Sequence, residues 1–469
     1  MQGLICLTER DYMGKDVVEK ELRQRFAEFI VNIHYEDLPE DVIDQAKRCT
    51  LDFVGVTLAG SKVGIAPIIT SIICATGGKE EATIIGDGRK IPALHAALVN
   101  AARGHTLDMD DCQRYASGHP GIVTIPAAFA IGEREDAGGK DIIEAVVAGY
   151  EMFLRIASAI NPTHLGRGFH TTGTVGPFAA AAACSKLLGL NKKEIGNALS
   201  IAGLQGAGLL EVTTSGQMMK PLQPGRAVQG GVLASLLAKE GAEGPDLIFE
   251  GEKGFLNAYS DVKAIDSLFA GLGSNFEIMG AAFKLYAVCR VSHPSIDAAL
   301  EICIKECLGG KDIEAIEIET FPYAIRLCGH IVHPDTPLAA KFSIPYSIAM
   351  AISFGDLFMD KFTDENIHNE DVKKLASKVK VSVGDEWARS YPGKKGATVT
   401  IRTHSGKVYS SSVSLPKGEP ENPATLKDLM EKFLANSTPV LSPEKSRKLG
   451  RNIMELENLS IRDITHFAY

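Results

Sequence analysis

Four long segments rich in alanine, glycine and other small apolar residues set the strongest limit on how this chain folds. They are IPALHAALVNAA (91–102), IVTIPAAFAIGER (122–134), GPFAAAAACSKLLGL (176–190) and NKKEIGNALSIAGLQGAGLL (191–210). Apolar residues recur in them at helical spacing, and alanine is the strongest helix former. Because small side chains let helix axes approach closely, we predict a large, tightly packed helical body.

The pattern changes near Ala270, after which alternating segments typical of β-strands appear. DIEAIEIETFPY (312–323) and KVKVSVGD (378–385) alternate in this way, and ATVTIRTHSGKVYSSSVSLPKG (397–418) predicts a hairpin. Helical patterns return after Pro416. We therefore predict a mainly α protein with three segments: a helical domain over 1–273, an α+β domain over 274–418, and C-terminal helices over 419–469 that return to the helical domain.

Charge and cysteine content exclude several classes of function. The 469 residues carry a net charge of −9, which argues against a nucleic-acid partner. The N-terminus is too charged for a signal peptide, and no run of about 18 apolar residues predicts a membrane span. The nine cysteines form no CxxC pair and are odd in number, which favours reduced thiols and a cytoplasmic protein.

Residues 104–119, GHTLDMDDCQRYASGH, concentrate three aspartates and two histidines between two apolar helices. Charges in such a place are unfavourable unless something uses them. A solvated helix end with an acidic cap is one explanation of this pattern. A Mg²⁺ site at DMDD is another, but no phosphate-binding loop accompanies it, so we predict no metal.

The same stretch suggests how its polar side chains are presented. If it begins as a helix, Asp108, Asp111, Cys112 and Tyr115 share one face. The glycines and the proline that follow interrupt the helix. His119 is then left on a loop, where a side chain can meet a ligand.

Four further stretches place polar residues where the local pattern predicts burial. They contain His170 (164–177), Lys220 and Arg226 (213–231), Lys284, Cys289, Arg290 and His293 (283–297), and Tyr323 (320–330). A histidine just before a helix can exchange protons with a bound anion, and a lysine among apolar residues can be a pocket cation. Each also has an ordinary explanation: a loop histidine, a surface lysine, a packed cysteine or a core tyrosine at a strand end.

Four segments together resemble the signature segments of the MmgE/PrpD family. They are DMDDCQRYASGHP, GRGFHTTGTVG, MKPLQPGRAVQGG and FKLYAVCRVSHPSID, in this order and at similar intervals. The resemblance covers roughly residues 25 to 460. It implies an all-helical domain with a smaller α+β lid, a homodimer, an active site in the cleft between the domains, and no metal or organic cofactor.

The resemblance also implies active-site positions. Carried over from the decarboxylases of the family, they are Asp108, Cys112, His119, His170, Lys220, Cys289 and Tyr323. Cys112 stands where that branch is expected to have threonine, and Cys289 where it is expected to have histidine. One extra residue also separates Cys112 from His119. CRVSHPSID instead resembles the dehydratase-like members, in which a Cys-Arg pair precedes the same His-Pro.

The reactions of the family make or quench a carbanion next to a carboxylate, and they need a base, an acid and a cation. We expect His119 and His170 to be the acid–base pair, because imidazoles titrate near neutral pH. Which of the two is the acid stays open. Lys220 is expected to stabilise the enediolate charge, helped by Lys284 or Arg290.

Two residues are expected to assist this pair, and six to bind substrate. Asp108 would orient His119 and raise its basicity, and Tyr323 would donate a hydrogen bond from the lid. The expected substrate-binding residues are Cys112, Lys284, Cys289, Arg290, His293 and Arg226.

These expectations predict a dehydratase that acts on a hydroxylated di- or tricarboxylate such as 2-methylcitrate. An epimerase of the iminodisuccinate type or a decarboxylase of the cis-aconitate type would use the same site. A binding protein that kept the fold but lost turnover is the remaining alternative.

Overall fold

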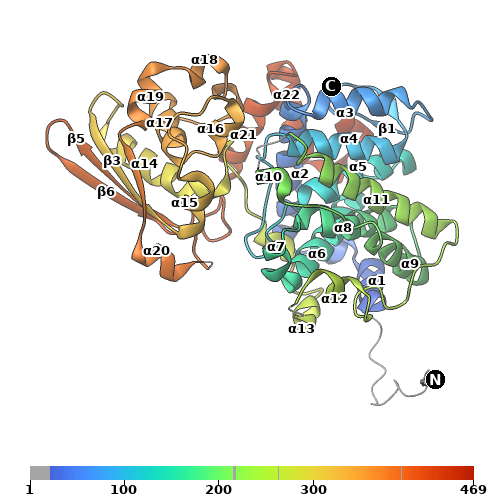
Figure 1. Cartoon of the computed structure of the whole chain (residues 1–469). Helices are drawn as coiled ribbons and strands as arrows, with labels where there is room; N and C mark the ends of the chain where they lie inside the picture. The colour runs from blue at the N-terminus through green and yellow to red at the C-terminus, as the bar shows by residue number, and fades with distance from the viewer. Residues whose placement is uncertain (1–21, 215–217, 262–263, 392) are drawn as a thin grey trace, which may run out of the picture.

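The computed structural model describes residues 22–214, 218–261, 264–391 and 393–469, and it shows two lobes of unequal size (Figure 1). The N-terminal segment in which no signal peptide was expected lies mostly outside these ranges. In the described ranges, no helix combines the length and the apolar character needed to cross a membrane. Helices dominate, and the sheets are small, so the prediction of a mainly α protein is confirmed.

The larger lobe is a bundle of helices. Its long helices are α1 (Leu22–Asn32), α2 (Glu40–Gly60), α3 (Ala66–Ala75), α4 (Ala93–His105), α5 (Gly121–Glu135), α6 (Gly139–Ile160), α8 (Thr171–Leu187), α9 (Lys192–Gly203) and α11 (Leu222–Lys239). Shorter elements connect them: α7 (Thr163–Gly166), α10 (Glu211–Thr214), α12 (Phe255–Tyr259), α13 (Ile265–Phe269), η1 (Tyr35–Asp37), η2 (Glu277–Gly280) and the two-residue strands β1 (Ala82–Thr83) and β2 (Lys90–Ile91).

Small residues set the spacing at the centre of this bundle, where α8 packs against α11 and α6. The alanines 179 to 183 of α8 are fully buried. A Cβ on Gly231 of α11 would lie 2.5 Å from the backbone oxygen of Pro177, a distance that real Cβ atoms do not tolerate. The close approach of these two helices therefore depends on glycine at position 231.

The smaller lobe is built around a four-stranded sheet of order β4-β3-β5-β6. The strands are β3 (Ile313–Thr320), β4 (Val379–Val383), β5 (Ala397–Thr403) and β6 (Val408–Val413), and only the β3–β4 pair is parallel. The remaining elements are η3 (Arg290–Ser292), α14 (His293–Glu306), α15 (Pro322–Cys328), α16 (Pro337–Lys341), α17 (Ile344–Phe354), η4 (Met359–Lys361), α18 (Asp364–Ile367), α19 (Glu370–Ala376) and α20 (Asp385–Ser390).

Strand β3 follows the alternating pattern of the sequence, but it ends earlier than that pattern predicted. Ile313, Ile316 and Ile318 point into the core, and the glutamates between them are exposed. The strand pairs with β4 and β5 on its two edges. It ends at Thr320 because Pro322 begins α15 two residues later, so Tyr323 lies in a helix and not at the strand end that the pattern predicted.

The C-terminal helices α21 (Leu426–Ser437), α22 (Pro443–Met454) and α23 (Ile461–Thr465), with η5 (Leu456–Asn458), pack on the larger lobe. Helices α21 and α22 contact α2 (Figure 1). Their buried residues belong to the core of the larger lobe, whereas buried residues from 287 to 401 form a second core. The boundaries at 273 and 418 themselves stay a prediction.

Candidate functional site

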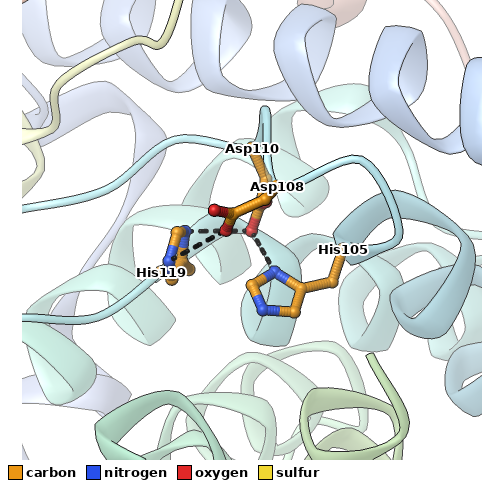
Figure 2. Close-up of side chains that lie close together, drawn as sticks. All are labelled: His105, Asp108, Asp110 and His119. Carbon is orange, nitrogen blue, oxygen red and sulfur yellow. Dashed lines mark hydrogen bonds and ion pairs between the residues drawn. The ribbon is translucent and has the colours of Figure 1, made fainter. Parts of the chain in front are cut away.

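The end of α4 and the loop that joins it to α5 bring four side chains to one point (Figure 2). The ligand-type atoms of His105, Asp108, Asp110 and His119 all lie within 4.8 Å of one another. Helix α4 ends at His105, and Asp108 has φ of 55°. The expectation of a helix through Asp108 was therefore wrong, because the left-handed backbone at this residue turns the chain and folds the aspartates back over the site.

Asp110 lies between two imidazoles. Its Oδ2 is 2.8 Å from Nδ1 of His105 and 3.1 Å from Nδ1 of His119, which also lies 2.9 Å from the carbonyl oxygen of Asp111. Burial would raise the pKa of Asp110, but the two facing imidazoles hold it well below its usual range. An ionised carboxylate and a carbonyl can only accept, so both imidazoles carry their proton on Nδ1. In the neutral ring of His119, Nε2 is then the nitrogen without a proton, and it can act as a base.

Asp108 is held by two lysines. Its Oδ1 lies 2.8 Å from Nζ of Lys220 and 3.3 Å from Nζ of Lys284, which also donates to the Asp108 carbonyl at 2.6 Å. Against the effect of burial, these cations keep the pKa of Asp108 well below its usual range. The same Oδ1 lies 4.0 Å from Nε2 of His119. The carboxylate behind His119 is thus Asp110, and Asp108 faces the opposite edge of the ring.

His170 completes the cluster from the start of α8. It is buried, its ring stacks on that of His105 at 5.9 Å, and its Nδ1 lies 2.7 Å from Oε1 of Gln223. Gln223 is oriented by a hydrogen bond from its Nε2 to the carbonyl of Leu209 at 3.0 Å. His170 therefore donates from Nδ1 and keeps Nε2 free. Burial, reinforced by the charge of Lys220, holds the pKa of His170 well below its usual value, so this imidazole is neutral.

The donor set around Asp108 suits an anion better than a metal cation. His105, Asp108, Asp110 and His119 have the spacing of a cation site. Two ammonium groups, however, lie within 3.3 Å of the same Asp108 oxygen. A divalent cation there would face two positive charges at close range. The geometry therefore favours a carboxylate ligand beside Lys220 and Lys284.

The smaller lobe contributes a second group of polar side chains. Cys289 is buried, and a hydrogen bond from Cys328 lowers the pKa of its thiol. Tyr323, on the same helix as Cys328, is half-buried, and burial raises the pKa of its hydroxyl, with the charge of Cys289 as a further cause. Lys341 is 8% exposed, its carbonyl accepts from the Cys289 amide at 2.9 Å, and burial lowers the pKa of its ammonium group to about 8.

The remaining expected binding residues have other partners. The amide and carbonyl of Cys112 bridge to Ala282, and burial raises the pKa of its thiol to about 11. Arg290 pairs with Glu419 at 2.7 Å and approaches Nδ1 of His293 at 3.1 Å. His293 is fully buried, and its Nε2 lies 3.3 Å from the carbonyl of Val288.

The contacts of Arg226 also lie away from the cluster. It is exposed on α11 and hydrogen-bonds to Gln229 on the same helix. Lys220, six residues earlier, instead reaches Asp108. Residues 215–217 of the stretch that carried both predictions lie outside the described residues. The structure thus brings Asp108, His119, His170, Lys220 and Lys284 together and leaves Arg226 outside.

Sequence reasoning missed four members of this arrangement: His105, Asp110, Gln223 and Lys341. His105 and Asp110 belong to the stretch 104–119, but the helix expected there did not predict a contact between them. Gln223 follows Lys220 by three residues, which was a usable signal. Lys341 carried no local signal, because only the folded smaller lobe places it beside Cys289.

Asp111 adds a buried acid behind the loop. Its Oδ2 accepts from the hydroxyl of Tyr150 at 2.8 Å, and its Oδ1 accepts from the amide of Gly121 at 3.1 Å. Burial, with the nearby charge of Asp52, raises its pKa from 3.8 to about 8. Asp111 is therefore protonated in the folded chain at neutral pH.

Asp111 is expected to make the folded state less stable as the pH rises. Between pH 3.8 and 8 the folded chain holds a proton that the unfolded chain has released. The stabilisation is complete below the unfolded pKa and is lost as the pH rises through the folded one. Asp111→Asn should remove this contribution. Between pH 6 and pH 7 the unfolding free energy of the wild type should therefore fall by about 1 kcal/mol more than that of the variant. Urea unfolding at the two pH values measures the unfolding free energies of both proteins. An equal change with pH in the variant and in the wild type would contradict the prediction.

Comparison with known proteins gives two family matches and several similar proteins. The family descriptions are the MmgE/PrpD N-terminal domain, over residues 24–267, and the MmgE/PrpD C-terminal domain, over residues 286–457. Cis-aconitate decarboxylase of Aspergillus terreus is 28% identical over 454 residues, 92% of each chain. Human cis-aconitate decarboxylase is 26% identical over 461 residues, 94% of each chain. The 2-methylcitrate dehydratase of Salmonella typhimurium is 23% identical over 95% of this chain and 98% of its own.

Proposed function

This chain belongs to the MmgE/PrpD family, and from that premise we propose that it is a lyase that acts without a cofactor. Its substrate is a hydroxylated di- or tricarboxylate such as 2-methylcitrate, from which it eliminates water by proton transfer next to a carboxylate. One observation carries the proposal: the free Nε2 of His119 faces Asp108, where two lysine ammonium groups converge.

The site supplies the three functions that such a reaction needs. His119 Nε2 takes the proton next to the carboxylate, while Asp110 on the opposite edge of the ring stabilises the imidazolium that forms. The developing enediolate charge falls near Lys220 and Lys284, which together with Asp108 carry one net positive charge (two cations and one anion). The departing hydroxyl takes up the proton that His119 has accepted and leaves as water. His170 is the second imidazole of the acid–base pair and faces the site with its unprotonated Nε2, and Tyr323 donates a hydrogen bond from the smaller lobe.

Decarboxylation of a cis-aconitate-like acid is the second candidate. The cis-aconitate decarboxylases of Aspergillus terreus are 28% identical to this chain, against 23% to 25% for the dehydratases. Loss of CO₂ also leaves a carbanion next to a carboxylate, so the same lysines would stabilise it. An iminodisuccinate-type epimerase would use the same base and acid on opposite faces of one carbon.

One incubation series separates these reactions. 2-Methylcitrate, citrate, cis-aconitate, a tartrate-like hydroxy acid and iminodisuccinate are each followed by NMR in D₂O. Water loss supports the dehydratase, CO₂ release the decarboxylase, and deuterium exchange at constant mass the epimerase. Binding of these acids without any turnover would overturn the proposal in favour of a binding protein. Activity that a chelator abolishes would overturn its independence from a metal.

We further propose that the site lies in a cleft which the smaller lobe covers as a lid, and that the protein is cytoplasmic. Leu107 and Met109, on the site loop of the larger lobe, pack in the core of the smaller lobe. This contact supports a site shared by both lobes. Every cysteine in the described residues is free, in keeping with a reducing compartment.

The protein is expected to be a homodimer, and its exposed apolar residues offer a surface for the second copy. Ile68 and Ile72 lie one turn apart on α3, and Leu233 and Leu237 one turn apart on α11. Both helices flank α4. Light scattering should give about twice the chain mass of 50.2 kDa, and Ile72→Glu with Leu237→Glu should yield monomers by burying charge at the interface. A monomeric wild type would contradict the prediction.

A further inference from the structure

His105 occupies a place in the cluster that the proposed chemistry does not use. It is the last residue of α4 and is 1% exposed. Its Nδ1 donates to Oδ2 of Asp110 (Figure 2), and its ring lies 4.8 Å from that of His119. Within the described part of the chain, its Nε2 has no hydrogen-bond partner. A buried imidazole in contact with the carboxylate behind the base needs an explanation beyond packing.

The decisive feature is that one carboxylate oxygen of Asp110 contacts the imidazole rings of both His105 and His119. Oδ2 of Asp110 accepts from His105 at 2.8 Å and lies 3.1 Å from Nδ1 of His119. A carboxylate behind an imidazole favours its protonated form. A second donor on the same oxygen takes up part of that negative charge. The contact to His105 is the shorter of the two, so this oxygen forms its stronger hydrogen bond with His105.

We propose that His105 is a positioning residue: through its bond to Asp110 it fixes that carboxylate and limits how strongly the carboxylate favours a protonated His119. The consequence is that His119 stays unprotonated, and so able to act as a base, at a lower pH than an unshared Asp110 would allow. This inference rests on the proposed function only in taking His119 as the base.

His105 is suited to this role because it is an uncharged donor. Burial lowers its pKa to about 4, against the opposing charge of Asp110. It therefore shares the carboxylate without adding a positive charge of its own at neutral pH. The other ionisable groups that face His119 are Asp108, Asp110 and His170. Lys220 and Lys284 lie against Asp108, and the carboxyl of Asp111 faces Tyr150. The substitution His105→Leu changes none of these residues.

Three variants isolate the shared bond. His105→Leu removes the donor and keeps a side chain of similar size. His105→Asn keeps a donor, because the asparagine amide nitrogen occupies the place of Nδ1. His164→Leu is the matched control, since His164 is also fully buried but bonds to Tyr259 and Thr174 instead of Asp110. If His105→Leu does not fold, His105→Gln replaces it. The glutamine amide nitrogen lies nearer to the position of Nε2, so this variant also lacks the donor at the position of Nδ1.

The test is a pH titration of the histidine ¹⁵N resonances, with the His119 signal assigned by its loss in His119→Asn. In His105→Leu the midpoint for protonation of His119 should move up by about one pH unit, and it should stay at the wild-type position in His105→Asn and His164→Leu. An unmoved midpoint in His105→Leu, or equal shifts in the leucine and asparagine variants, would overturn the inference. The acidic limb of the kcat/KM profile should move with the midpoint. The titration needs no turnover, so it tests the inference even if the protein converts none of the acids in the substrate series. That outcome would contradict only the proposed function.

Discussion

Replacing His119 with asparagine is expected to lower kcat/KM for the accepted substrate by about 10²- to 10⁴-fold. The asparagine amide nitrogen takes the place of Nδ1, so the contacts to the Asp111 carbonyl and to Asp110 are kept. What is lost is Nε2, the atom that faces Asp108 and the two lysines. The loss should therefore appear mainly in kcat, because Lys220 and Lys284, the proposed ligands of the substrate carboxylate, are untouched.

The matched control for this prediction is His164→Asn. His164 is as deeply buried as any histidine of the cluster, but its partners are the Tyr259 carbonyl and the Thr174 hydroxyl. It should keep turnover close to that of the wild type. His170→Asn should resemble His119→Asn, since it keeps the bond to Gln223 and loses the second free nitrogen. Near-normal turnover in both the His119 and the His170 variants would show that this pair does not carry the chemistry.

The sequence was most informative where one local rule determined the structure. Runs of alanine at helical spacing gave α4, α5, α8 and α9, and alternation gave β3. Both patterns depend on which face of an element is buried, and a sequence displays that directly. The convergence of His119, His170 and Lys220 was also expected, but it came from the resemblance of whole segments and not from any local rule.

The details of the site could not be predicted, because they depend on one backbone angle and on contacts across long sequence distances. The positive φ of Asp108 reverses the chain, so that Asp110, and not Asp108, meets Nδ1 of His119. No propensity favours that angle at an aspartate strongly enough to predict it. Lys284 reaches the carbonyl of Asp108 across 176 residues, and only the folded lobes bring the two together.

A lysine from the C-terminal helices holds the site loop from behind. Nζ of Lys432, on α21, donates to the carbonyl of Met109 at 2.7 Å and pairs with Asp52 on α2. The side chains of the pair are 2% and 1% exposed. Met109 lies between the two aspartates that face His119, so this contact fixes the part of the loop where the chain turns. The return of the C-terminal segment to the larger lobe thus serves the site as well as the core.

Lys432→Met is expected to cost about 3–5 kcal/mol of unfolding free energy, because it leaves the Asp52 carboxylate buried without its cation. The double variant Lys432→Met with Asp52→Leu should recover most of that loss, since replacing both charges of a buried pair by apolar groups is close to neutral. Lys193→Met, which breaks an exposed pair with Glu243, should leave the urea midpoint unchanged. Urea unfolding measures all three. The double variant should still turn over more slowly than the wild type, because it restores the charge balance but not the bond to the Met109 carbonyl. Full recovery of both stability and turnover would mean that Lys432 serves only to neutralise Asp52 and has no part in holding the loop.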